Sequence, residues 1–188
     1  MPAGKLPTGK LIVITGPSGV GKGTIVRALL QRHPDLSLSI SSTTRQPRPG
    51  ETDGKDYYFT TKEQFTSAIA EGEFLEWAEY AGNYYGTPKT KVQKLLDQGE
   101  LVLLEIELLG ARAIANIFPD ATRIFILPPS LEELATRLRD RGQDPEAAIA
   151  KRLARAEAEI AASNEFPIQI INQDLEKAIA EVEQAIFN

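Results

Sequence analysis

Residues 11–22 read Leu-Ile-Val-Ile-Thr-Gly-Pro-Ser-Gly-Val-Gly-Lys, and this stretch decides the fold. The apolar run 11–14 is rich in β-branched residues and predicts a strand that is buried on both faces. A glycine-rich turn follows, and then a helix from about Lys22 to Arg32. Segment 16–22 matches the P-loop pattern through its lysine, in the strand–turn–helix context that the pattern requires. Backbone N–H groups and the positive end of the helix then predict a phosphate site.

The residues of this loop are the predicted ATP-binding residues. Lys22 is predicted to be catalytic, because it adds a full charge near the transferring phosphoryl group. The next residue is Gly23, and the hydroxyl comes one place later, at Thr24. This variant resembles the P-loops of nucleoside-monophosphate kinases, and it leaves open whether Thr24 contacts Mg²⁺ directly, through water, or binds phosphate only. The predicted loop residues are Gly16, Pro17, Ser18, Gly19, Val20, Gly21, Lys22, Gly23 and Thr24.

Composition excludes several classes of protein. The chain has 188 residues and no cysteine, so thiolate metal sites and cysteine nucleophiles are excluded, and with His33 as its single histidine a Ser-His-Asp triad is excluded as well. A net charge of −5 argues against general binding to nucleic acid. No apolar run approaches the roughly 20 residues of a membrane helix, and the first ten residues show no secretory signal, so we expect a cytoplasmic protein.

Beyond the loop, strands alternate with helices. Buried strands are predicted at 36–42, 101–106, 122–127 and 168–171, and helices at 61–71, 88–98, 109–118, 130–141, 145–162 and 175–187. This rhythm implies an α/β fold of the P-loop NTPase type, with helices on both faces of a parallel sheet. Segment 39–93 lacks the rhythm and reads as an inserted lobe, with short strands at 57–59, 74–80 and 84–85 and with Trp77 expected in its core.

A second anion site is predicted in that lobe. Arg45 and Arg48 lie three residues apart in a stiff, proline-flanked loop, and paired guanidinium groups bind phosphate oxygens bidentately. This loop, together with Glu76-Trp77 and the segment 83–87, Asn-Tyr-Tyr-Gly-Thr, resembles the GMP-binding lobe of guanylate kinases. The resemblance covers nearly the whole chain, from Lys10 to the terminal helix.

The resemblance implies roles for individual residues. Four residues match those that hold the GMP phosphate in the family: Arg45, Arg48, Tyr57 and Tyr85. Of these, Arg45 is also expected to be catalytic. Those that match the guanine-binding residues are Ser41, Glu76, Thr87 and Glu107. The chemistry agrees, because guanine offers adjacent N1–H and 2-amino donors to a carboxylate, whereas adenine offers a bare acceptor there.

One segment departs from the family pattern. The family usually reads Asp-Ile-Asp, a variable residue, Gln and Gly, whereas residues 105–110 read Glu-Ile-Glu-Leu-Leu-Gly. Each Glu is one methylene longer than Asp, and Leu109 replaces the polar Gln. We therefore expect altered geometry at the guanine edge or near Mg²⁺. Whether Mg²⁺ is bound through Thr24, through Glu105 or through water stays open. The separate roles of Glu105 and Glu107 stay open as well.

Five of the eleven arginines fall between Arg137 and Arg155. The matching region of guanylate kinases is a lid over ATP, and by position Arg137, Arg141 and Arg152 reach the phosphates as catalytic residues. Arg139 and Arg155 are expected to pair with neighbouring carboxylates. Asn172, after the last strand, matches a family position near the adenine.

The sequence thus predicts a single domain, 1–188, that transfers a phosphoryl group from ATP to GMP, reversibly and with Mg²⁺. Its core is expected at 1–38 and 94–188, the GMP-binding lobe at 39–93 and the lid at about 137–155. The expected partners are the small molecules ATP and GMP, with dGMP left open; no nucleic acid or membrane is expected, and the oligomeric state is open. The alternatives are a P-loop kinase acting on AMP or a sugar phosphate, a silent guanylate-kinase-like module that binds phosphorylated partners, and a GTPase-like switch, which the absence of an Asn-Lys-x-Asp motif disfavours.

Overall fold

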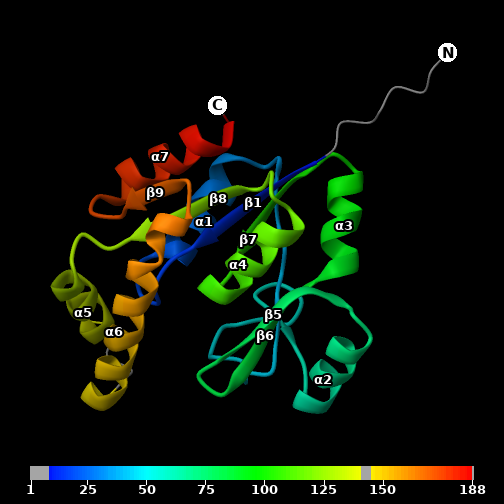
Figure 1. Cartoon of the computed structure of the whole chain (residues 1–188), viewed down its shortest axis with the longest axis horizontal. Coiled ribbons are helices and arrows are strands. Elements are labelled where there is room, and N and C mark those ends of the chain that lie inside the picture. The colour runs from blue at the N-terminus through cyan, green and yellow to red at the C-terminus, as the bar shows by residue number, and fades with distance from the viewer. Residues whose placement is uncertain (1–8, 141–144, 188) are drawn as a thin grey trace. The chain divides into compact units, whose positions relative to one another are not determined.

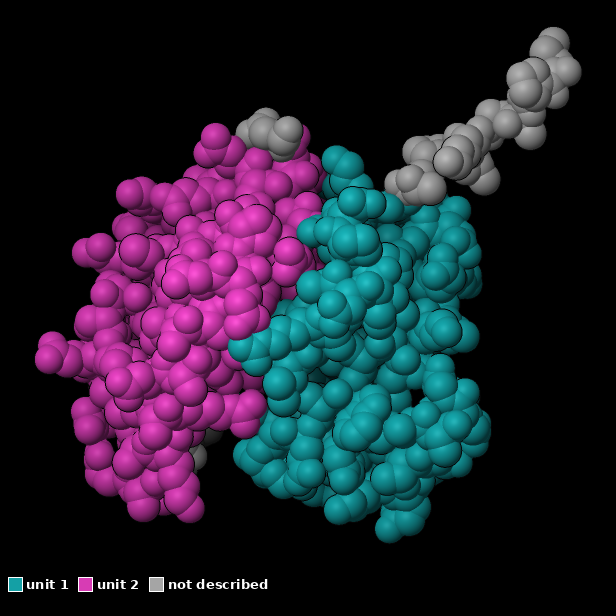
Figure 2. Space-filling model, viewed as in Figure 1, with its two compact units in different colours: residues 1–11, 35–104, 109–121 teal, residues 12–34, 105–108, 122–188 magenta. Residues whose placement is uncertain are grey.

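The computed structural model describes residues 9–140 and 145–187, and the chain forms two compact units (Figure 2). Unit 1 comprises residues 1–11, 35–104 and 109–121, and unit 2 comprises residues 12–34, 105–108 and 122–188. Both units contain parallel strands interleaved with helices, so the predicted α/β class is confirmed.

Unit 2 is built on parallel strands that support the P-loop (Figure 1). Strand β1 (Lys10–Thr15) runs parallel to β8 (Thr122–Leu127), and β8 runs parallel to β9 (Ile168–Ile171). The β1 residues from Ile12 to Thr15 are at most 1% exposed, as expected of a strand covered on both faces. The helices of this unit are α1 (Lys22–Arg32), α5 (Leu131–Asp140), α6 (Glu146–Ala161), the short 3₁₀ helix η1 (Ser163–Glu165) and α7 (Leu175–Phe187). Helix α1 packs against α7, and α5 packs against α6.

Unit 1 holds a parallel strand pair and a separate mixed sheet. Strand β2 (Leu36–Leu38) pairs with β7 (Leu101–Glu105), and the helices α3 (Lys89–Asp97) and α4 (Leu108–Ile117) flank β7 in the sequence. The mixed sheet has the order β4-β3-β6-β5 and consists of β3 (Ser42–Thr43), β4 (Tyr58–Phe59), β5 (Phe74–Tyr80) and β6 (Asn83–Pro88). Strands β5 and β6 form an antiparallel hairpin in which Glu76 lies opposite Thr87.

Helix α2 (Lys62–Ala70) covers part of this hairpin. It begins at a capping box, in which Thr61 and Gln64 satisfy each other's backbone N–H groups. Phe65, which is 1% exposed, stacks on Phe74 and Tyr84 at ring-centroid distances of 4.5 and 5.5 Å. Gly86 of β6 leaves room for these rings, because a Cβ there would lie 2.9 Å from both Phe65 and Phe74.

Two predictions about the lobe are wrong. The single strand predicted over 36–42 is divided, because the backbone leaves the parallel pair after the N–H of Ser39 donates to Leu103 O, and it pairs again only as β3. Trp77, expected in the core, is 47% exposed. Side chains alternate along a strand, and the inward positions of β5 belong to Glu76 and Ala78, so Trp77 faces outward.

No helix of residues 9–140 and 145–187 is long and apolar enough to span a membrane.

Candidate active site

The P-loop connects β1 to α1 in unit 2. Gly16 has a φ of 144°, and a Cβ there would collide with the backbone of Ile126, so a glycine is required. Gly21, with a φ of 104°, is the N-cap of α1 and offers no side-chain cap to the helix. The positive end of α1 is therefore left to an external anion, as the sequence predicts for a phosphate site.

Lys22 lies within this loop. Its side chain is largely buried, and its Nζ donates to the carbonyl oxygens of Gly16 and Pro17 at 2.5 and 3.1 Å. The ammonium group is thus held by loop carbonyls at the start of α1, where the phosphates of a nucleotide are expected. A bound phosphate oxygen can replace either carbonyl as the partner of Nζ.

Polar groups from the helices and from β9 reach the same loop. Arg137 of α5 donates to Asn172 O at 2.9 Å and to Val20 O at 3.5 Å, and Asn172 Nδ2 donates to Val20 O at 2.8 Å. Arg152 of α6 donates to Ser18 Oγ at 2.7 Å. The structure therefore brings three of the predicted donor-site residues from outside the loop to the loop itself.

The remaining arginines of the predicted lid behave differently. Arg155 pairs with Glu159 at 2.8 Å, as predicted, and Arg139 pairs with Glu146 at 2.8 Å. Arg141 lies outside the described residues.

Two carboxylates lie at the carboxyl end of β7: Glu105 is its last residue, and Glu107 comes two residues later. A Cβ placed on Gly23 would lie 3.6 Å from Glu105 Oε1, so this carboxylate is in van der Waals reach of the first turn of α1. Burial raises the pKa of Glu105; Lys22 opposes that rise, and Glu107 adds to it. The Oε2 atom of Glu107 is buried and has no hydrogen-bond partner among the described residues. A bound donor or cation would compensate both of these half-buried carboxylates.

The donor oxygens at this place fit Mg²⁺. Carboxylate and hydroxyl oxygens are the ligands that Mg²⁺ takes in nucleotide sites, usually one or two of them together with substrate phosphates and water. Glu105 and the Thr24 hydroxyl, which accepts from Arg27 at 3.3 Å, are such donors. Within the described ranges no cluster of three or more His, Asp or Glu side chains forms a metal site by itself.

The predicted acceptor residues gather in unit 1. The guanidinium carbon of Arg45 lies 5.3 Å from the centre of the Tyr57 ring, and the rings of Tyr57 and Tyr85 meet edge to face at 6.1 Å. Three of the four residues expected at the GMP phosphate therefore lie together. The side chain of Arg48 is exposed, and its backbone N–H donates to Glu51.

Glu51 organises this cluster, and the sequence analysis did not single it out. Its Oε1 accepts from Arg45 Nη2 at 2.8 Å, and its Oε2 accepts from the backbone N–H of Arg48 at 2.7 Å. One carboxylate thus fixes both ends of the arginine loop. Its position directly after Pro49-Gly50 is the signal that could have found it, because a carboxylate after a tight turn can reach back to the turn's own N–H groups.

We expect Glu51→Gln to raise the KM for GMP roughly tenfold, with a smaller change in kcat, because a charge-assisted bond to Arg45 is lost. The bond to Arg45 is the main cause that lowers the pKa of Glu51 below its usual 4.5. Since this pKa is lowered, the pair contributes at neutral pH and is lost only as the pH falls through the lowered value.

The measurement is steady-state kinetics with GMP as the varied substrate, between pH 6 and pH 9. Asp56→Asn is the matched control, because Asp56 Oδ2 caps the same loop by accepting from the N–H of Thr52 at 2.8 Å without holding an arginine. An equal rise in KM for both variants contradicts a specific role for Glu51.

A buried carboxylate lies deeper in the same unit. Glu76 is 7% exposed, and it accepts a hydrogen bond from the hydroxyl of Thr87, which is fully buried. Both residues lie on the β5–β6 hairpin, at positions that face each other. Ser41 is half-buried, and its carbonyl accepts from the N–H of Tyr58 at 2.9 Å. Glu76 and Glu107 belong to different units, so their joint action on a guanine stays a prediction.

Comparison with known proteins places this arrangement in a family. Residues 8–188 match the family model described as guanylate kinase. The chain belongs to the guanylate kinase family. It is 62% identical to the guanylate kinase of Thermosynechococcus vestitus over 180 residues, which cover 96% of this chain and 94% of that protein. It is 61% identical to the guanylate kinase of a Nostoc species, over 96% of this chain and 90% of that protein.

A solved structure supports the same assignment. The crystal structure of guanylate kinase from Anaplasma phagocytophilum superimposes with a TM-score of 0.80 at 33% sequence identity, and the match covers 96% of this chain and 85% of that one. The predicted family and the predicted fold class, a parallel sheet flanked by helices, are both confirmed. Members of this family are nucleoside-monophosphate kinases, so the P-loop seen here is the donor-site element of an enzyme family.

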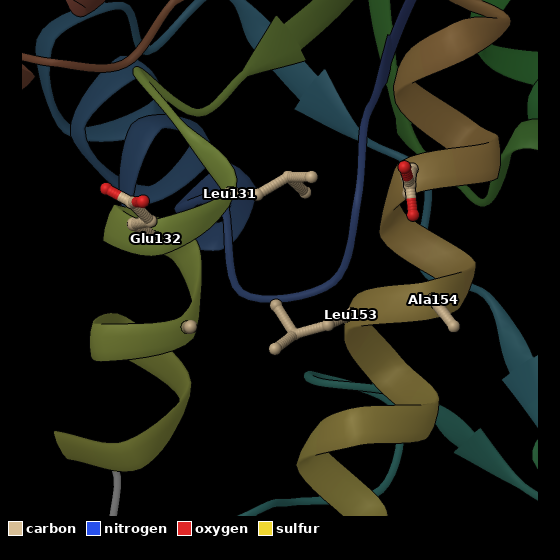
Figure 3. A pocket seen from close by; sticks show the side chains of 6 residues that line it. Leu131, Glu132, Leu153 and Ala154 are labelled. Atoms are coloured by element: carbon tan, nitrogen blue, oxygen red, sulfur yellow. The ribbon is translucent and has the colours of Figure 1, made fainter.

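A separate pocket of about 400 Å³ lies between α5 and α6 (Figure 3). Its lining is Leu131, Glu132, Ala135, Leu153, Ala154 and Glu157. The lining contains two carboxylates and no basic side chain, and it includes none of the predicted ATP-binding residues. This pocket therefore does not suit the phosphates of a nucleotide.

Proposed function

We propose that this chain transfers the γ-phosphoryl group of ATP to GMP, giving ADP and GDP, and that it also runs the reverse reaction. The observation that carries the choice of acceptor is the carboxylate of Glu76, which is buried and fixed by the Thr87 hydroxyl. A buried carboxylate needs donors, and guanine supplies two adjacent ones, N1–H and the 2-amino group. The GMP phosphate belongs with Arg45, Arg48, Tyr57 and Tyr85, and the base with Ser41, Thr87 and Glu107 in addition to Glu76.

The chemistry requires positioning and charge neutralisation more than proton transfer. The acceptor oxygen of GMP is already an anion at neutral pH, so no general base has to activate it. The obstacle is the repulsion of two phosphate groups that must meet in line. Lys22, Arg137 and Arg152, already at the P-loop, neutralise charge on the donor side, and Arg45 does so on the acceptor side. The same role is proposed for Arg141.

Mg²⁺ is proposed as the cofactor that accompanies ATP. When bound, it supplies Lewis-acid stabilisation of the phosphate oxygens. Glu105 and Thr24 are the residues that would hold it, directly or through water. Asn172, whose amide donates to Val20 O, is proposed to lie near the adenine. We further propose that segment 39–93 works as the GMP-binding lobe, that the core consists of 1–38 and 94–188, and that 137–155 works as the lid.

The test is ADP formation from Mg-ATP with GMP, AMP, CMP or UMP as the only acceptor. Turnover with GMP well above that with the other three supports the proposal. Turnover with AMP instead keeps the phosphotransferase and removes the guanine assignment. Binding of GMP without turnover points to a silent binding module, which is the outcome that the intact P-loop argues against.

A further inference from the structure

Gly110 lies in the first turn of α4, against the carboxylate of Glu76. A Cβ placed on Gly110 would collide with Glu76 Oε2 and would lie 2.8 Å from Cδ and 3.4 Å from Oε1. Gly110 itself is buried, and both residues belong to unit 1. The three atoms nearest to this missing methyl group are thus the three atoms of a single carboxylate.

The backbone does not require a glycine at this position. Gly110 is not among the described glycines with a positive φ, and it lies within a regular helix. In a helix, glycine is less favourable than alanine because it loses more backbone freedom on folding. Local stability therefore favours a side chain here, and only the space occupied by Glu76 opposes one.

Glu76 cannot move aside freely. Its side chain is 7% exposed, and its Oε1 is fixed by the hydroxyl of Thr87, which is itself fully buried. A methyl group on residue 110 has to displace the carboxylate from this bond or push α4 away from the hairpin.

We infer that Gly110 is a specificity-determining residue, which holds the Glu76 carboxylate in the position that recognises the 2-amino group of the acceptor purine. The inference rests on the proposed function. It deepens that function by assigning the discrimination between GMP and a 6-oxopurine without the 2-amino group to the packing of Gly110 on Glu76. The residue acts through Glu76 and does not itself contact the base.

The test compares Gly110→Ala with the unaltered enzyme, using GMP and IMP as acceptors. IMP keeps the N1–H donor and lacks the 2-amino group. We expect Gly110→Ala to lower kcat/KM for GMP roughly tenfold or more and to lower that for IMP much less, so that the GMP/IMP ratio falls. The KM for ATP is expected to stay within about twofold, since the P-loop is untouched.

A double-mutant cycle separates positioning from general damage to the fold. In a Glu76→Ala background there is no carboxylate to displace, so adding Gly110→Ala is expected to change kcat/KM for GMP by less than about twofold. Asn116→Ala, at an exposed position of the same helix, is the control for a change in helix propensity and should leave the GMP/IMP ratio unchanged. An unchanged GMP/IMP ratio in Gly110→Ala, or an equal loss in both backgrounds, overturns the inference.

The same assays distinguish a failure of the proposed function from a failure of the inference about Gly110. If the unaltered enzyme does not phosphorylate GMP, the function itself is wrong, whatever Gly110 does. If it phosphorylates GMP and Gly110→Ala keeps the GMP/IMP ratio, the function stands and only the role of Gly110 is lost.

Discussion

Replacing Lys22 with methionine is expected to lower kcat roughly 10²–10³-fold, the loss typical of removing one preorganised charge from a transition state. The ammonium lies at the start of α1 among loop carbonyls, so it is in place before the nucleotide arrives. Methionine keeps the length and the apolar stem of the side chain but supplies no charge. Because charge on the transferring group is largest in the transition state, kcat should fall more than the affinity for ATP.

Two measurements accompany this kinetic result. Circular dichroism should show a folded Lys22→Met protein whose stability falls by no more than about 2 kcal/mol, since only two bonds to loop carbonyls are lost. Lys177→Met, in the last helix, is the matched control: that side chain is 77% exposed, its ammonium lies 3.8 Å from Glu181, and its turnover should equal that of the unaltered enzyme. A Lys22→Met enzyme that retains more than about a third of its turnover would exclude a catalytic role for this lysine.

The donor side of the site could be predicted from the sequence because its determinants are local. Gly16, Gly21 and Lys22 are set by six consecutive backbone positions between one strand and one helix, and such a turn has few alternatives. Arg137 and Arg152 were predicted from their match to family positions in an arginine-rich region, and both contact the loop. The carbonyl or hydroxyl group to which each arginine donates depends on how the helices pack, and this packing cannot be predicted from the sequence.

The lobe that holds Glu76 was harder to predict because a buried charge there departs from the usual pattern. In β5 a carboxylate, Glu76, takes an inward position that is normally apolar, and Trp77 is consequently outward. The hydrophobicity of Trp77 therefore predicts that its side chain is buried, whereas the side chain is exposed. The segment 36–42 was predicted as one strand but is divided, because its first part pairs with β7 and its last residue with β6, in two different sheets.

Two residues lay beyond the reach of sequence reasoning. Glu51 acts on Arg45 and on the N–H of Arg48, across a turn whose shape has to be known first. Gly110 is a glycine in a helix, which sequence rules treat as a weak position with no particular role. Only the contact with the Glu76 carboxylate, from a segment more than thirty positions earlier, explains it. His33 shows the same limit: its N–H caps α1, while its ring stacks on Phe187 and bonds to Glu183, both in the last helix of the chain.

Replacing Glu76 with glutamine is expected to lower kcat/KM for GMP roughly 10²–10⁴-fold, since a site built to bond a polar edge strongly rejects a mismatched partner. Glutamine has the same shape and can still accept from the Thr87 hydroxyl through its carbonyl oxygen. Its amide NH₂, however, is a donor and faces one of the two guanine donors. Two donors brought together in a buried site leave both without a partner, which is the costly case.

The direction of the specificity change distinguishes recognition from stability. The ring N1 of adenine is an acceptor, and the glutamine NH₂ can donate to it, so turnover with AMP relative to GMP should rise in Glu76→Gln. The unfolding midpoint should change little, because burying an amide is less costly than burying a carboxylate. Glu79→Gln is the matched control: it removes the same charge from an exposed position of the same strand, and its AMP/GMP ratio should not change. If instead Glu76→Gln loses GMP and AMP turnover equally, the carboxylate stabilises the hairpin and does not recognise the base. The acceptor preference then has to come from Glu107 on the other unit.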